Sequence, residues 1–284
     1  MKLLRFGAVG AERPGLLDDS GVVRDLSSVV DDIAGAAITP QGLDRLRSLD
    51  PSELPAAPHD GRLGPCVAGV RKVLGIGRNY ADHAAEMAAA APSEPLVFSK
   101  ATSAITGPND GLILPKGSTH TDWEIELGVV IGTPAQYVSE ATALDHVAGY
   151  CIVNDVSERR YQKERGGQFV KGKSADTFCP LGPWLVTRDA VPDPQALTLR
   201  LSLNGEVRQD GATRDMIFSV AHLVSYLSQF MTLETGDIIT TGTPAGVGAG
   251  QTPPRFLQSG DILDLEIAGL GRQQHHVRRF EETV

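Results

Sequence analysis

Hydrophobic residues in this chain fall in short runs, separated by turns that are rich in glycine and proline. Residues 197–211 alternate apolar and polar positions around Asn204-Gly205, which predicts a β-hairpin with a two-residue turn. Residues 259–280 predict a final hairpin, whereas residues 219–233 have apolar side chains at helical spacing. Strand signals therefore outnumber helix signals. This pattern favours an α+β, strand-dominated fold, a mixed β-roll with peripheral helices, over a doubly wound parallel sheet.

The chain divides into two predicted units. Residues 1–68 are expected to form a small N-terminal α/β domain, with a helix over 39–49 that Thr39 caps and Pro40 begins. Residues 51–65 are rich in proline and polar residues, which is typical of a linker. Residues 69–284 are expected to form the larger main domain, which opens with a strand at 70–77.

Composition narrows the range of partners and compartments. The 284 residues carry a net charge of −9, so repulsion of phosphate backbones makes nucleic acid an unexpected partner. No apolar run is long enough for a transmembrane helix, and the first residues do not match a secretory signal, so we predict a cytoplasmic protein without membrane contact. Three widely spaced cysteines argue against disulfides and a zinc site.

Two acidic side chains on one predicted strand are the first candidate metal ligands. Side chains alternate along a strand, so Glu124 and Glu126 point to the same face while Ile125 points to the other. Adjacent carboxylates repel one another unless a cation lies between them. A solvated acidic surface strand is the alternative, but the apolar continuation of this strand favours an interior cleft.

A third carboxylate, Asp155, directly follows an apolar predicted strand. Three carboxylates without a nearby cysteine or histidine pair form a hard-oxygen site that suits Mg²⁺ or Mn²⁺ and leaves positions open for water and a chelating substrate. The alternative role for Asp155 is that of a helix cap, because a helix could begin in the residues that follow it.

His83 and Glu86 are three residues apart on a predicted helix, so they share a face and can form a hydrogen bond. A histidine oriented by a carboxylate is a general base that can activate water. An ordinary surface pair is the alternative. The preceding turn and the alanine-rich segment after Glu86 favour a mobile lid over residues 80–95.

Two loops add further candidates. Residues 167–184 contain Lys171 and Lys173, and a lysine on a glycine-rich loop can neutralise an oxyanion, although Lys171 is expected to be solvated. Residues 240–248 place Thr241 and Thr243 in a tight loop whose backbone N–H groups suit a carboxylate or a phosphate. This loop matches neither a P-loop nor a dinucleotide-binding fingerprint.

Five segments in order and spacing resemble the fumarylacetoacetate hydrolase family over about residues 70–280. They are GIGRNYADHAAEM, DWEIELGVVIG, VNDVSERRYQ, KGKSADTFCPLGPW and GDIITTGTPAGVG. The resemblance implies a β-roll catalytic domain, a homodimer, and Mg²⁺ or Mn²⁺ held by Glu124, Glu126 and Asp155.

The resemblance also assigns roles to individual side chains. It implies His83 and Glu86 as the lid dyad, and Lys173 as the active-site lysine. The residues expected to bind a 2-oxo acid substrate are Arg78, Tyr80, Gln162 and Thr243. A fourth carboxylate found in the eukaryotic hydrolase is replaced here by Ile76, so water is expected in that coordination position.

Within the family, the chain looks most similar to bacterial enzymes that hydrolyse 2,4-diketo-3-deoxy-L-fuconate or L-rhamnonate to pyruvate and lactate. That similarity implies hydrolysis of a C–C bond in a 2,4-diketo sugar acid. The alternatives are a lyase or decarboxylase acting on a 2-oxo acid such as oxaloacetate, an isomerase-like relative, ureidoglycolate lyase, and a non-catalytic binder that kept the fold. The presence of both His83 and Glu86 argues against the last of these.

Overall fold

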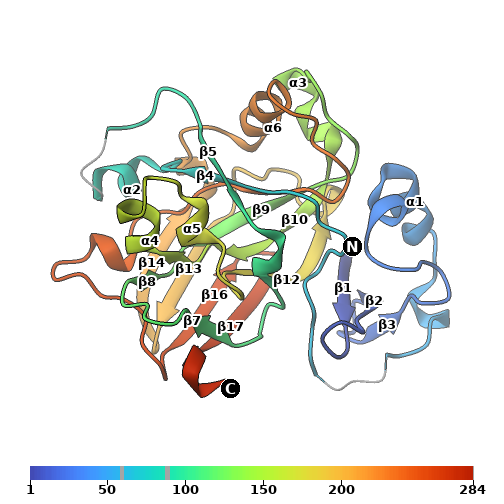
Figure 1. Ribbon diagram of the computed structural model, residues 1–284. Helices are drawn as coiled ribbons and strands as arrows, with labels where there is room; N and C mark the ends of the chain where they lie inside the picture. Colours follow the sequence, from blue (N-terminus) through green and yellow to red (C-terminus); the bar gives the residue numbers. More distant parts are fainter. Residues whose placement is uncertain (58–60, 87–89, 284) are drawn as a thin grey trace.

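The computed structural model describes residues 1–57, 61–86 and 90–283. Its largest element within those residues is a ten-stranded mixed sheet, whose strands run in the order β3-β2-β1-β12-β10-β9-β15-β4-β5, with β6 beside β12 (Figure 1). The bounds are β1 (Lys2–Phe6), β2 (Arg13–Leu17), β3 (Val23–Asp25), β4 (Val73–Gly77), β5 (Leu96–Lys100), β6 (Ile105–Thr106), β9 (Ile125–Ile131), β10 (Val147–Asn154), β12 (Cys179–Thr187) and β15 (Ile238–Thr240).

A second sheet packs against the first. It has the order β14-β13-β16-β17-β7, and a short ribbon pairs β11 with β8. The bounds are β7 (Leu112–Leu114), β8 (Thr121–Asp122), β11 (Ser157–Glu158), β13 (Thr198–Leu203), β14 (Glu206–Ala212), β16 (Ile262–Ile267) and β17 (Gly271–Arg279). Buried apolar residues from both sheets form one continuous core. The strand-dominated α+β fold expected from the sequence is confirmed.

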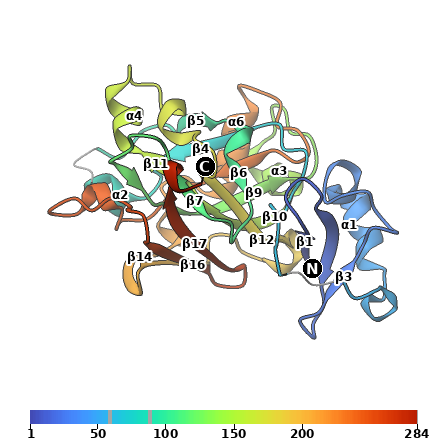
Figure 2. The ribbon, with the colours of Figure 1, turned by 60° about the horizontal axis from the view of Figure 1, so that its bottom comes forward.

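Helices lie around the sheets. They are α1 (Pro40–Arg47), α2 (Ala81–Glu86), α3 (Glu140–Ala143), α4 (Arg159–Glu164), α5 (Val170–Lys173) and α6 (Val220–Ser228). In both views α2 and α4 lie at the end of the molecule opposite β1 and α1 (Figure 2). None of the helices in the described ranges is long and apolar enough to span a membrane.

Local signals placed several elements correctly. The Thr39 side chain accepts a hydrogen bond from the N–H of Gly42, and helix α1 starts at Pro40, as predicted. The β13–β14 hairpin turns at Asn204 and Gly205, whose positive φ angles of 53° and 82° fit the two-residue turn. The terminal hairpin pairs β16 with β17.

The N-terminal unit is joined to the main sheet more closely than the sequence suggests. Strand β1 pairs with β12, and Leu3 lies opposite Leu185. Residues 58–60 of the predicted linker lie outside the described residues, while Leu63 forms a β-bridge with Phe6. The division at residue 68 therefore stays a prediction about domains, although strands from both sides of it share one sheet.

Candidate metal centre and active-site cleft

The three predicted metal ligands come from two neighbouring antiparallel strands. Glu126 lies within β9, Glu124 immediately precedes it, and Asp155 follows β10. The backbone N–H of Asp155 donates to the carbonyl of Glu124 at 2.9 Å, which extends the β9–β10 pairing by one step. Because these positions share one face, one carboxylate oxygen from each residue lies within 4.8 Å of the other two. The cluster is buried.

Three buried carboxylates this close form a donor set of hard oxygen atoms, which fits Mg²⁺ or Mn²⁺. The pKa of Glu126 is raised well above its ordinary value by burial and by the charges of Asp155 and Glu124. Within the described residues Glu126 takes part in no ion pair, and it accepts a 2.8 Å hydrogen bond from the N–H of Gly242. This carboxylate would therefore gain most from a bound cation.

Cationic side chains neutralise the other two carboxylates. Burial alone would raise the pKa of Glu124, but the charges of Arg159 and Lys173 outweigh it and lower that pKa. Lys100 donates to Oδ1 of Asp155 at 2.5 Å, and Lys173 contacts the other oxygen. Burial likewise would lower the pKa of Lys173, but Asp155 and Glu124 together raise it.

Sequence reasoning missed Lys100 and Arg159. Lys100 ends β5, where alternate residues face inward, so it shares the face of Phe98. Arg159 begins α4, three residues before the predicted substrate ligand Gln162, and helical spacing puts the two on one face. Both spacings can be seen in the sequence, but neither predicts which carboxylate the cation would pair with.

The predicted dyad lies beside the cluster. Nδ1 of His83 is 3.2 Å from Oε2 of Glu86, and His83 lines the same small cleft as the three carboxylates. A carboxylate only accepts hydrogen bonds, so the neutral ring carries its proton on Nδ1 and leaves Nε2 as a base. The predicted mobility of residues 80–95 stays a prediction, since residues 87–89 lie outside the described residues.

Most other predicted site residues also line this cleft, which has a volume of about 100 Å³. They are Arg78, Gln162, Lys173 and Thr243, and Ile76 occupies the wall where a fourth carboxylate was considered. The hydroxyl of Thr243 donates to the carbonyl of Ile125 and accepts from Gln209, so contact with a substrate carboxylate would require an exchange of these partners.

Two predicted candidates lie elsewhere. Tyr80 is fully buried and is absent from the cleft lining, and its hydroxyl has no hydrogen-bond partner in the described structure. Direct substrate contact by Tyr80 would therefore require the surrounding chain to move. Lys171 is exposed and donates to the carbonyl of Arg165, which fits the solvated role expected for it.

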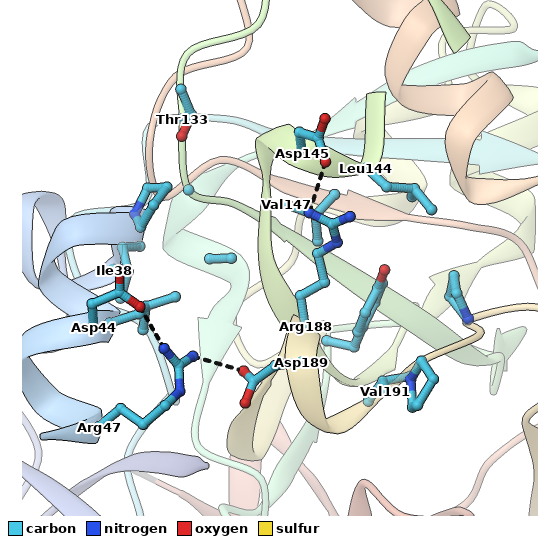
Figure 3. A pocket seen from close by; sticks show the side chains of 17 residues that line it. Ile38, Asp44, Arg47, Thr133, Leu144, Asp145, Val147, Arg188, Asp189 and Val191 are labelled. Atoms are coloured by element: carbon cyan, nitrogen blue, oxygen red, sulfur yellow. Dashed lines mark hydrogen bonds and ion pairs between the residues drawn. The ribbon is translucent and has the colours of Figure 1, made fainter. Parts of the chain in front are cut away.

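A larger cavity of about 410 Å³ lies between α1 and the end of the sheet near Thr133 and Val147 (Figure 3). Its cations face carboxylates: Arg47 bonds to Asp44 and Asp189, and Arg188 bonds to Asp145. It has no histidine among its lining residues and none of the clustered carboxylates. The smaller cleft is therefore the better candidate for catalysis.

The chain is similar to known proteins over most of its length. The family model described as fumarylacetoacetate (FAA) hydrolase C-terminal matches residues 72–278. A relative from Burkholderia ambifaria, which carries the general name of a presumed hydrolase, is 60% identical over 279 residues, covering 98% of this chain and 99% of its own.

Solved structures resemble the whole chain. A fumarylacetoacetate hydrolase from Exiguobacterium antarcticum is 39% identical with a TM-score of 0.88, covering 98% of this chain and 99% of its own. A 2-hydroxyhepta-2,4-diene-1,7-dioate isomerase from Mycobacterium marinum is 35% identical with a TM-score of 0.75, covering 99% of both chains. Maleylpyruvate hydrolase from Sphingobium sp. SYK-6, in complex with manganese(II) and pyruvate, is 29% identical with a TM-score of 0.81, covering 98% and 99%.

Proposed function

Because this chain belongs to the fumarylacetoacetate hydrolase family, we propose that it hydrolyses a C–C bond in an acylpyruvate-type 2-oxo acid with the help of Mg²⁺ or Mn²⁺. The observation that carries the proposal is that one small cleft is lined both by the three clustered carboxylates and by His83, which is paired with Glu86. The maleylpyruvate hydrolase, which has a similar fold, binds manganese and pyruvate, and this supports metal-dependent cleavage of a 2-oxo acid as the proposal for this chain.

The proposed metal site consists of Glu124, Glu126 and Asp155. A divalent ion held there would act as a Lewis acid that polarises the 2-oxo group and stabilises the negative charge left on the pyruvate half. The protein positions these ligands through neighbouring groups, since the N–H of Gly242 and the side chain of Lys100 each hold one carboxylate. Such partners fix the orientation of the ligating oxygens.

The chain's own residues would then carry the proton transfers. His83, held by Glu86, takes a proton from water, and the oxygen of that water attacks the C4 carbonyl of the substrate. Lys173 supplies positive charge for the oxyanion that develops at C4. The C3–C4 bond breaks with its electron pair going to C3, and the proton that His83 took from water is returned to C3, which releases pyruvate together with the second acid.

For the substrate we propose a 2,4-diketo sugar acid, 2,4-diketo-3-deoxy-L-fuconate or L-rhamnonate, which would give pyruvate and lactate. The support for this choice is the resemblance of the segments at 100–115, 171–186 and 221–248 to bacterial enzymes of that class. Gln162 and Arg78 line the cleft and offer hydrogen-bond donors to substrate oxygens.

The similarity to an isomerase favours a second candidate function, a reaction that proceeds through an enolate without attack by water. Decarboxylation of oxaloacetate and isomerisation of a dienoic 2-oxo acid both need stabilisation of an enolate, which the same cluster would provide. Such reactions would use the carboxylate cluster and Lys173, and they would not depend on water activation by His83.

A substrate panel with Mn²⁺ separates the hydrolase from the decarboxylase. Pyruvate release is measured by coupling to lactate dehydrogenase, with the two 2,4-diketo-3-deoxy sugar acids, acetylpyruvate and oxaloacetate as substrates. We expect Mn²⁺-dependent pyruvate release from the diketo acids, with the sugar acids fastest. Release from oxaloacetate alone would replace the hydrolase with the decarboxylase, and no turnover of a diketo acid would contradict the proposal.

We also propose that the protein is a homodimer, as the family resemblance implies. Multi-angle light scattering over a dilution series is expected to give twice the chain mass of 30.1 kDa. A mass of one chain at every concentration would contradict the dimer.

A further inference from the structure

Two oxygens in the carboxylate cluster share a single cation. Nζ of Lys173 lies 2.5 Å from Oε2 of Glu124 and also contacts Oδ2 of Asp155. The ammonium group therefore bridges carboxylates from the two strands β9 and β10. Lys173 is buried, with 2% of its surface exposed, so water contributes little to neutralising this pair.

The two remaining oxygens have partners of their own. Arg159 donates to Oε1 of Glu124 at 2.8 Å, and Lys100 donates to Oδ1 of Asp155 at 2.5 Å. These two cations therefore hold the outer oxygens. The other two, Oε2 of Glu124 and Oδ2 of Asp155, contact Lys173, and Oε2 also accepts from the hydroxyl of Ser157 at 3.2 Å. The ammonium group therefore lies between two of the three carboxylates that would hold a divalent ion.

In this position Lys173 also contacts an aromatic ring. Its Nζ lies 4.7 Å from the ring centroid of Phe98, whose aromatic face attracts a cation. Phe98 lines the cleft together with Gln162 and Phe169. A lysine that leaves the carboxylates can therefore stay against this ring and enter the part of the cleft where substrate would lie.

We propose that Lys173 substitutes for the metal in the metal-free protein and must be displaced before a divalent ion can bind. Loading the site would then move the Lys173 ammonium towards the substrate, so that metal binding prepares the catalytic lysine. Lys100 and Arg159 are positioning residues, which keep the outer oxygens fixed during the exchange. This inference rests on the proposed metal site, and it adds that Lys173 leaves the carboxylates before the divalent ion binds.

The test is Mn²⁺ binding to the substrate-free protein, measured by isothermal titration calorimetry and by the electron paramagnetic resonance signal of free Mn²⁺. Lys173→Met removes the competing ammonium group, and we expect its Kd for Mn²⁺ to fall at least tenfold below that of the wild type. Lys173→Gln, with a polar but uncharged tip, is expected to change in the same direction and serves if the Met variant does not fold.

Lys100→Met is the matched control, because it removes the same charge from the same aspartate without vacating the position between the carboxylates. We expect its Kd not to fall below that of the wild type, because Lys100 positions Asp155, and we expect the exposed Lys171→Met to match the wild type. A Kd in Lys173→Met equal to that of the wild type, or an equal gain in Lys100→Met, would overturn the inference while leaving the metal site intact. Absence of Mn²⁺ binding in every protein would overturn the metal site and the inference together.

Discussion

The backbone N–H of Gly246 donates a 2.9 Å hydrogen bond to Oε1 of Glu86, whose other oxygen faces Nδ1 of His83. One carboxylate thus connects helix α2 to the glycine-rich loop after β15 and orients the proposed base. Asp82 adds a second, weaker connection, since its Oδ2 accepts from the N–H of Ala245 at 3.3 Å. The geometry of the base therefore depends on contacts between two segments that are far apart in the sequence.

His83→Ala is expected to abolish most hydrolysis while leaving metal binding unchanged. Loss of a general base typically costs about 10²–10⁴-fold in rate. The carboxylate cluster stays intact, so the Kd for Mn²⁺ should match the wild type, and any decarboxylation of oxaloacetate should suffer less than hydrolysis. The measurement is kcat for both substrates, with His222→Ala on the exposed side of α6 as a control. Hydrolysis by His83→Ala at the wild-type rate would show that His83 does not activate water.

Glu86→Gln and Glu86→Ala separate the two functions of this carboxylate. The amide oxygen of Gln can still accept from Gly246, but its NH₂ group cannot accept the proton of His83. We expect both variants to lose activity, by about tenfold or more, with Glu86→Ala the more sensitive to proteolysis within 81–86 because the connection to the loop is gone. Limited proteolysis and kcat measured side by side test this, and equal protease sensitivity in all three proteins would contradict it.

The buried imidazole of His275 is expected to make the free energy of unfolding depend on pH, independently of catalysis. Burial lowers the pKa of this imidazole to about 4, against 6.5 in the unfolded chain. Between these values the unfolded chain binds a proton that the folded protein does not, so the free energy of unfolding falls as pH decreases from about 6.5 to about 4. The full loss is roughly 3 kcal/mol. Urea unfolding at a series of pH values measures it.

The control for this prediction is His275→Gln, which removes the titrating ring from the core. The variant is expected to be less stable at neutral pH, because the ring packs in the core and Nε2 lies 3.1 Å from Oε1 of Gln273. Its stability should, however, fall less between pH 6.5 and 5 than that of the wild type. Parallel curves for the two proteins over that interval would contradict the assignment.

The shared sheet predicts that the N-terminal unit unfolds together with the rest of the chain. Leu3 is fully buried opposite Leu185, and Leu3→Ala is expected to cost about 2–5 kcal/mol. Trp184 lies near the N-terminus and Trp123 near the cleft, so Trp→Phe variants at each position leave one local fluorescent reporter. We expect both reporters to give one coincident transition, shifted equally by Leu3→Ala. A shift confined to the Trp184 reporter would show that residues 1–68 unfold separately.

Sequence periodicity predicted which side chains of the carboxylate cluster and of the dyad share a face, although it left the surface alternatives open. Alternation along one strand places Glu124 and Glu126 on one face. Asp155 directly follows a second apolar strand, so it is expected at the end of that strand. Helical spacing places His83 and Glu86 on one face. These are local relationships, which depend on elements whose type is evident from the chain.

The pairing of Lys100 with Asp155 is not local. Three strands separate β5 from β10 in the sheet order, which in a flat sheet would place them about 19 Å apart at the usual strand spacing. The 2.5 Å contact between these side chains therefore requires the sheet to depart from a flat arrangement between the two strands. Curvature and strand order are tertiary properties, and the same holds for the pairing of β1 with β12.

Removal and return of the metal tests whether the three carboxylates hold a divalent ion that is needed for cleavage of a diketo acid. Pyruvate release from 2,4-diketo-3-deoxy-L-fuconate is measured after EDTA treatment and again after addition of Mn²⁺, for the wild type and for Glu126→Gln. We expect that EDTA abolishes release, that Mn²⁺ restores it in the wild type, and that Glu126→Gln stays inactive and binds Mn²⁺ more weakly. Undiminished release in EDTA, or full activity of Glu126→Gln, would contradict this role of the metal.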